Sequence, residues 1–258
     1  MAGDGDAANI SPHLSSPLAC AQCRALQKFT MTSQTHAFDD LKPSRADIER
    51  MCDTQQPTTL TNCDLDGLDL SDLDFTGWCF DHCGCKRTSF NGSQLDGTSF
   101  KSCRAADARF LGAALQESTI DGGDFSNTDF RNALLADITI RHCKMTGADL
   151  TDAKTANLVL QDVLLVFAIL PKLSFRKMTL RRVNFSEADL RSCDFRDSIF
   201  DDCSLRDANL ENCMFENADL RGADLSGVRL HDARRFKGAL ISKRQAAELL
   251  AQLGLRVF

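Results

Sequence analysis

The chain has 258 residues, of which 26% are charged, and a formal net charge of −6 at pH 7. No stretch approaches eighteen consecutive apolar residues, so we expect no membrane-spanning helix. The amino terminus lacks a basic start followed by an apolar core, so no cleavable signal peptide is expected, and the negative charge argues against direct nucleic-acid binding.

Residues 1–57 show no regular hydrophobic period, and we expect a flexible segment up to about His36 because small residues dominate it. Ser44 is a good N-cap for a short helix near 44–52 that ends before Pro57. Cys20 and Cys23 form a lone C-x-x-C. Without a second such pair, we assign no metal to it, although a zinc site and free thiols both fit the spacing.

Residues 58–237 repeat every five residues. The 34 positions at steps of five from Leu65 to Leu230 carry large apolar residues, with Cys85, Ala105 and Thr155 as exceptions. Two residues earlier the chain carries mainly Ala, Cys, Ser, Thr or Val, and the other positions are mainly polar. A period of five fits neither a helix nor a strand. It predicts a chain that turns a corner every five residues, with one large and one small side chain pointing inward.

The cysteines indicate how many corners make one coil. One set of them is separated only by multiples of twenty, namely Cys63, Cys83, Cys103, Cys143 and Cys203. Four repeats per coil would place this set in one interior column, where free cysteine acts as a small apolar residue. We therefore predict a four-sided coil of about eight to nine turns and treat these thiols as core.

The pattern resembles the pentapeptide-repeat family, with its A-(D/N)-L-x-x motif. The clearest matches are Ala148-Asp149-Leu150, Ala188-Asp189-Leu190, Ala208-Asn209-Leu210, Ala218-Asp219-Leu220 and Ala223-Asp224-Leu225. The resemblance covers about 58–235. It implies an all-β solenoid, a right-handed quadrilateral β-helix, here with a short C-terminal α-helix and a partly disordered N-terminal segment.

Residues 238–258 are predicted to form a capping helix and tail. Ser242 is a good N-cap, Gly254 a good stop, and an apolar stripe lies between them. The segment resembles the tail of quinolone-resistance pentapeptide proteins, which implies a cap on the last coil and a two-fold homodimer. The candidate capping and dimerisation residues are Ala246, Leu249, Leu250, Leu253 and Leu255.

One segment breaks the rule that outward residues are polar. Five residues that should point outward are apolar, namely Val159, Leu164, Val166, Phe167 and Ile169. Contiguous apolar surface usually marks a contact site, so these residues form the candidate partner-binding patch. Cover by another part of the protein, or a local distortion of the coil, would also account for them.

No nucleophile motif, phosphate-binding glycine loop or paired-histidine helix occurs, so we expect no enzyme and no cofactor. Residues 60–170 carry 16 acidic and 9 basic residues, whereas 171–258 carry 13 acidic and 16 basic ones. Such asymmetry orients partners, although a solvated surface is the simpler interpretation.

Two functions follow from the resemblance. The first is a non-catalytic protein-binding β-helix of the bacterial effector type, with a protein partner of unknown identity, either cytoplasmic or secreted into a host cell by a non-Sec route. The alternative is a DNA mimic that binds DNA gyrase or topoisomerase IV and modulates quinolone or toxin sensitivity. The basic second half, the long N-terminal extension and the absence of an out-of-register loop fit the alternative less well.

Overall fold

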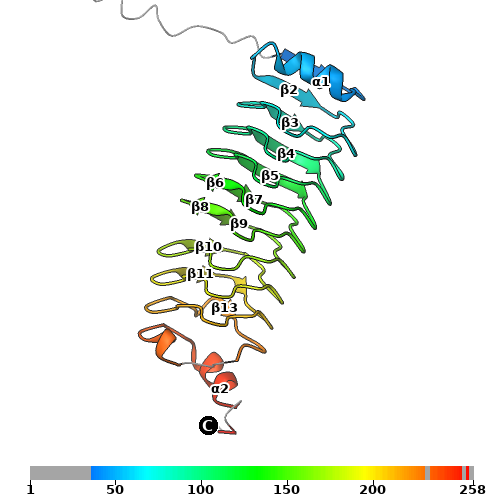
Figure 1. The fold of residues 1–258 in the computed structure, drawn as a ribbon. Coiled ribbons are helices and arrows are strands. Elements are labelled where there is room, and N and C mark those ends of the chain that lie inside the picture. The colour runs from blue at the N-terminus through cyan, green and yellow to red at the C-terminus, as the bar shows by residue number, and fades with distance from the viewer. Residues whose placement is uncertain (1–35, 230–232, 252–253, 256–258) are drawn as a thin grey trace, which may run out of the picture. The chain divides into compact units, whose positions relative to one another are not determined.

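The structure, a computed structural model, describes residues 36–229, 233–251 and 254–255. They form a right-handed, four-sided parallel β-solenoid of about nine turns with a helix near each end (Figure 1). This confirms the predicted fold class. The strands and helices are β1 (His36–Asp39), α1 (Arg45–Cys52), β2 (Thr58–Thr61), β3 (Cys79–Asp81), β4 (Ser99–Arg104), β5 (Thr119–Asp124), β6 (Leu134–Ala136), β7 (Thr139–Arg141), β8 (Lys154–Ala156), β9 (Val159–Gln161), β10 (Thr179–Arg181), β11 (Ile199–Asp201), β12 (Cys203–Ser204), β13 (Ala223–Asp224), the 3-10 helix η1 (Ala233–Phe236) and α2 (Lys243–Ala251).

The four sides of the coil are four parallel ladders. Side 1 is the nine-stranded sheet β1-β2-β3-β4-β5-β7-β9-β10-β11, in which each residue pairs with the one twenty positions later from β2 onward. Side 2 carries the bridges from Asp64 to Asp224, side 3 those from Asp69 to Asn209, and side 4 those from Asp74 to Met214. A corner consists of the two residues that follow each side. Four sides of five residues give the coil of twenty that the cysteines predict.

Large apolar side chains fill the interior in stacked columns. Phe90, Phe110 and Phe130 stack with ring centroids 5.1 and 4.8 Å apart and nearly parallel planes. A second column runs through Phe175, Phe195 and Phe215 at 4.9 and 5.0 Å. These residues are 0–1% exposed. Each coil therefore buries its apolar residues against only the coils next to it.

The small inward residues also bond the coils together. The Sγ atoms of Cys83 and Cys103 donate to the carbonyls of Leu60 and Phe80 at 3.2 and 3.3 Å. Thr88 does the same through its hydroxyl, 2.7 Å from the Leu65 carbonyl. A donor at this position thus satisfies a backbone carbonyl 23 residues earlier, which is a structural role.

The N-terminal end is covered by elements that the repeat does not predict. β1 pairs in parallel with β2 and extends side 1 by one strand. Ser44 caps α1 in a capping box with Asp47, and Ile48 on this helix is buried. Within 36–57 the chain thus forms a strand and a capped helix, the helix lying where the sequence places one near 44–52.

The C-terminal coil departs from the register by one residue. Up to Asp207, the backbone amides bond to carbonyls 19 residues later. The Phe215 amide instead bonds to the carbonyl of Arg235, 20 residues later, and the Phe236 ring stacks on Phe215 with centroids 4.8 Å apart. One residue is therefore inserted between 229 and 235, although Leu230, which ends the predicted series, lies outside the described residues. The C-terminal helix α2 begins at Lys243, directly after Ser242.

Candidate interaction surface

Four apolar residues form a ridge at the corner between sides 2 and 3. Leu164 and Ile169 lie in the neighbouring ladders of these two sides, and Val166 and Phe167 form the corner between them. Leu164, Phe167 and Ile169 are exposed by 45%, 55% and 37%, and Val166 is half-buried. We call these four residues the apolar ridge. Its large side chains stand where the other coils carry polar or small residues, mainly Asp, Asn, Arg, Ser and Gly.

Phe167 occupies an unfavourable backbone conformation. Its φ is +57°, in the left-handed region, and it is the only aromatic residue with a positive φ in the described part of the chain. Asp, Asn and Gly predominate at the equivalent corner positions because they tolerate this conformation. A large aromatic residue here is costly for the fold, and with its side chain more than half exposed, packing within the chain does not account for it.

Val159 does not belong to this ridge. It lies in β9 on side 1, where it pairs with Thr139, and is 49% exposed. Five residues along the chain correspond to one corner of the coil, so Val159 and Leu164 face different directions. The five-residue patch predicted from the sequence therefore divides into the apolar ridge and a separate residue on side 1. Ile199 in β11, 47% exposed, lies on the same side and was missed.

The C-terminal helix closes the last coil mainly through one polar residue. The side-chain amide of Gln245 donates to the carbonyls of Leu220 and Ala223 at 2.7 and 2.6 Å, and its oxygen accepts from the Ser242 amide. Leu249 is buried beside it. Gln245 was not predicted as a capping residue, and its only sequence signal is its place three residues after Ser242.

The other predicted tail residues differ in exposure. Ala246 is half-buried, while Leu250 and Leu255 are exposed, as are Leu240 and Ile241 just before the helix. Leu253 lies outside the described residues. The end of the solenoid thus carries a small apolar surface beyond the cap.

Aspartates between the two inward residues close the corners. The Asp129 carboxylate accepts from the Arg131 amide at 3.0 Å and binds the Arg131 guanidinium through both oxygens at 2.9 and 2.7 Å. This guanidinium lowers the pKa of the Asp129 carboxyl. Arg191, Arg196 and Arg221 hold Asp189, Asp194 and Asp219 in the same way. These carboxylates are therefore held by hydrogen bonds and ion pairs within the fold.

The described residues contain no cluster of three or more His, Cys, Asp or Glu side chains able to hold a metal. His82 contacts Asp81 at 2.6 Å, and His142 lies 2.9 Å from Asp121 and 3.5 Å from Asp162. The column cysteines are buried, and burial raises the pKa of the Cys143 thiol to about 12. His13, Cys20 and Cys23 lie outside the described residues.

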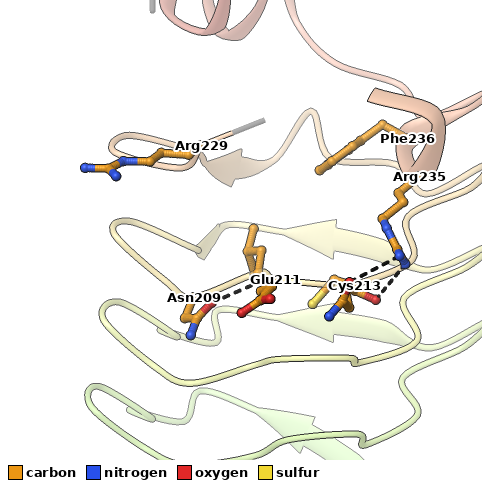
Figure 2. A pocket seen from close by; sticks show the side chains of 8 residues that line it. Asn209, Glu211, Cys213, Arg229, Arg235 and Phe236 are labelled. Atoms are coloured by element: carbon orange, nitrogen blue, oxygen red, sulfur yellow. Dashed lines mark hydrogen bonds between the residues drawn. The ribbon is translucent and has the colours of Figure 1, made fainter. Parts of the chain in front are cut away.

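A pocket of about 440 Å³ lies where the last coil changes register (Figure 2). Asn209, Glu211 and Cys213 line it from one coil, and Arg229, Arg235 and Phe236 from the next. Arg235 donates to the backbone and side-chain oxygens of Asn212 at 3.0 and 3.2 Å. The guanidinium thus fastens the shifted segment to the coil below it, and the pocket follows from the one-residue insertion.

The folded unit is thus a parallel β-solenoid with an apolar ridge on one corner. The model of the family described as pentapeptide repeats matches eight copies over residues 93–132, 124–154, 159–197 and 198–234. The chain belongs to the pentapeptide repeat family. Neither helix within the described ranges has the length and apolar character that a membrane crossing requires.

Solved structures give the same fold. A trypsin-treated variant of QnrB1, a plasmid-mediated fluoroquinolone resistance protein, is 21% identical with a TM-score of 0.56, covering 87% of this chain and 98% of that one. A second such variant is 23% identical at a TM-score of 0.53, with the same coverage. HetL, a pentapeptide repeat protein involved in heterocyst differentiation regulation from the cyanobacterium Nostoc sp. strain PCC 7120, is 20% identical at 0.48, covering 76% and 94%. No curated protein sequence matches the chain.

Proposed function

We propose that this chain is a non-catalytic, protein-binding β-solenoid and that the apolar ridge is its main contact surface. The observation that carries the proposal is Phe167, which is exposed by 55% at a φ of +57°. The fold gains little from an aromatic side chain in this place. Burial against a partner would offset the cost, since burying a phenylalanine side chain contributes about 1.5–3 kcal/mol.

Paired capture experiments test the ridge. The wild-type protein, Phe167→Asn and Lys172→Asn would each be immobilised and exposed to the same extract. Lys172 has a φ of +64° at the next corner of the same coil and is exposed, so it is a matched control. We expect a set of proteins that the wild type and Lys172→Asn retain and Phe167→Asn loses. Retention of the same set by all three would refute the ridge as the contact surface.

We also propose that the exposed apolar surface at the C-terminal end joins two copies of the chain. Leu250 and Leu255 are exposed by 36% and 54%, and the buried side of α2 is already occupied by the last coil. A closed two-fold contact is the commonest form of oligomer. Leu250→Glu should halve the mass found by sedimentation without unfolding the chain, and an unchanged mass would contradict this contact.

A second candidate function is binding to DNA gyrase or topoisomerase IV. Its support is the shared fold with a fluoroquinolone resistance protein over 87% of the chain, together with the acidic first coils. A supercoiling assay with and without a quinolone tests it, and no effect at micromolar protein would exclude it.

In the effector form of the first function, a reporter fused to residues 1–57 should leave the bacterium, and retention in the cytoplasm would refute export.

A further inference from the structure

Side 1 carries an uncharged strip along eight strands. The outward column from β2 to β11 consists of Thr59, Cys79, Ser99, Thr119, Thr139, Val159, Thr179 and Ile199. The equivalent columns of the other three sides all contain charged residues. Val159 and Ile199 are each about half exposed. Side 1 is therefore the side best suited to face-to-face packing against another sheet.

Charged residues border this strip at the corner between sides 4 and 1, acidic in the earlier coils and of both signs in the later ones. Asp96, Glu117 and Asp137 lie at this corner in the earlier coils and line a groove of about 370 Å³. Gly77 and Gly97 leave space in it because they lack side chains. Further along the same corner, before β10 and β11, lie Arg176, Lys177 and Arg196, together with Asp197, which pairs with Arg176 at 3.5 Å.

The opposite border, at the corner between sides 1 and 2, alternates in charge. From β3 onward the first corner residues are Asp81, Lys101, Asp121, Arg141, Gln161, Arg181, Asp201 and Arg221. Within the solenoid this alternation forms ion pairs between coils, such as Arg141 with Asp121 at 2.9 Å. The order of signs in the second half is also complementary to the inverted order of the first half.

We propose that side 1 binds side 1 of a second copy of this chain, with the two solenoids antiparallel. The two-fold axis lies between the two facing sheets, runs parallel to the strands, and passes midway between β7 and β9. This axis brings each border of one copy over the same border of the other, with the coil order reversed. β5 then lies opposite β10, and β4 lies opposite β11. The uncharged strips pack at the centre, with Val159 of one copy over Thr139 of the other.

Both borders become complementary in this one arrangement. Glu117 meets Lys177 and Asp96 meets Arg196 on one border. On the other border the opposed pairs are Asp81 with Arg221, Lys101 with Asp201, and Asp121 with Arg181. Displacing the axis by half a strand spacing in either direction opposes like charges on the second border, such as Asp81 with Asp201. The charges therefore select the register.

Glu117 and Lys177 are the decisive pair. Both are exposed, and neither forms an ion pair or side-chain hydrogen bond with another residue that the structure describes. Each lies one and a half strand spacings, about 7 Å, from the axis, where sheet twist displaces facing residues least. Their φ values are +55° and +60°, so glutamate and lysine are each accommodated at this corner position.

Charge reversal with complementation tests the proposal. Wild type, Glu117→Lys, Lys177→Glu and an equimolar mixture of the two variants would be studied as full chains by sedimentation at low salt. Each variant alone places like charges at both symmetric contacts, so we expect its self-association to weaken at least about tenfold. The mixture restores both opposite-charge contacts and should form heterodimers. Glu187→Lys, an exposed corner residue between sides 2 and 3, is the matched control.

The outcomes separate this contact from the C-terminal one. If the C-terminal contact also forms, the wild type is larger, but each variant still halves in mass and the mixture still recovers it. Variants with wild-type mass overturn the proposal. A monomeric wild type also overturns it and leaves side 1 to residues 1–35 or to another protein. Unchanged circular dichroism of the variants establishes that they remain folded.

Discussion

At the residue scale, the polar residues of the repeat serve the corners. Asp69 accepts from the Ser71 amide at 3.1 Å, and Asp149 accepts from the Thr151 amide at 2.8 Å. A carboxylate two residues before an amide closes a turn by this bond. The same geometry explains why many carboxylates can line a surface without forming a catalytic site. The informative residues are those that break the pattern, above all Phe167.

Replacing Phe167 by asparagine should stabilise the folded chain. Asparagine tolerates the left-handed conformation better than phenylalanine, so we expect a gain of about 1 kcal/mol in the free energy of unfolding. Urea denaturation measures this, with Phe167→Val as the opposite case because a branched Cβ is strained at positive φ. A lower stability of Phe167→Asn would show that the ring contributes to the fold.

The buried thiols should make the protein sensitive to alkali. Burial raises the pKa of Cys143 to about 12 and that of Cys203 to about 11. A thiol in the unfolded chain ionises near 8.5, so between these values the unfolded state releases protons that the folded state keeps. Stability is therefore fully present below about pH 8.5 and falls as the pH rises through the folded pKa values.

The test is the pH dependence of urea denaturation between pH 7.5 and 10.5. The chain contains no tyrosine, which removes one competing titration. Replacing Cys143 and Cys203 together by alanine should flatten the loss of stability with pH, even though the cavities lower stability overall. An equal slope in wild type and double variant would show that these thiols do not control the alkaline transition.

At the element scale, stability depends on stacked columns and on two caps of unlike construction. α1 covers the first coils with the apolar residue Ile48, whereas α2 closes the last coil with Gln245. Gln245→Ala would leave the Ala223 carbonyl without its side-chain donor, which costs about 1–3 kcal/mol for a buried group, whereas the Leu220 carbonyl would keep its bond from the Ala223 amide.

The expected result of Gln245→Ala is faster amide exchange in α2 and in the coil containing Leu220, with little change near Phe90. Gln116→Ala is the control, because Gln116 lies exposed at a corner. Equal exchange in both variants would mean that Leu249 packing alone holds the cap.

The sequence predicts this fold well because one inward row repeats over almost the whole solenoid. From Leu65 to Leu225 the large inward residue of each repeat is buried where the period places it, except at Thr155 and Leu210, which are partly buried, and the cysteine column gives the coil length. β1 could not be predicted, because a single strand has no period to detect. The register shift could not be predicted because the apolar series ends at Leu230, whereas the shift shows only in bonds such as that from the Phe215 amide to the Arg235 carbonyl.

The five residues of the predicted interaction site lie on different sides of the coil for a geometric reason. Val159 and Leu164 are close along the chain, but a coil of four sides places them around a corner from each other. Ile199, forty residues from Val159, shares its side instead. Gln245 was missed because the apolar stripe of the helix predicts capping by apolar residues. The two hydrogen bonds of Gln245 join it to carbonyls of the last coil, more than twenty residues away in the sequence.

At the scale of the whole molecule, a solenoid contributes stability coil by coil, and its open ends need protection. Parallel coils leave unpaired amides and carbonyls at each end, and these are free to pair with other chains. The cap has two parts, the bonds from Gln245 and the burial of Leu249, of which the second contributes about 2 kcal/mol. Removing both parts uncovers the apolar interior of the last coil.

Deleting residues 243–258 should therefore convert the protein into one that self-associates end to end. The exposed coil carries Leu220 and Leu225, which are 0% and 4% exposed in the intact chain. We expect light scattering to increase with concentration and the thermal midpoint of the last coil to fall. Deleting only 254–258 keeps Gln245 and Leu249 and should change neither property. If the longer deletion remains as soluble and as stable as the shorter one, η1 and the stacked Phe236 already close the C-terminal end of the solenoid. In that case α2 is not needed as a cap, and contact between two copies of the chain would be its role.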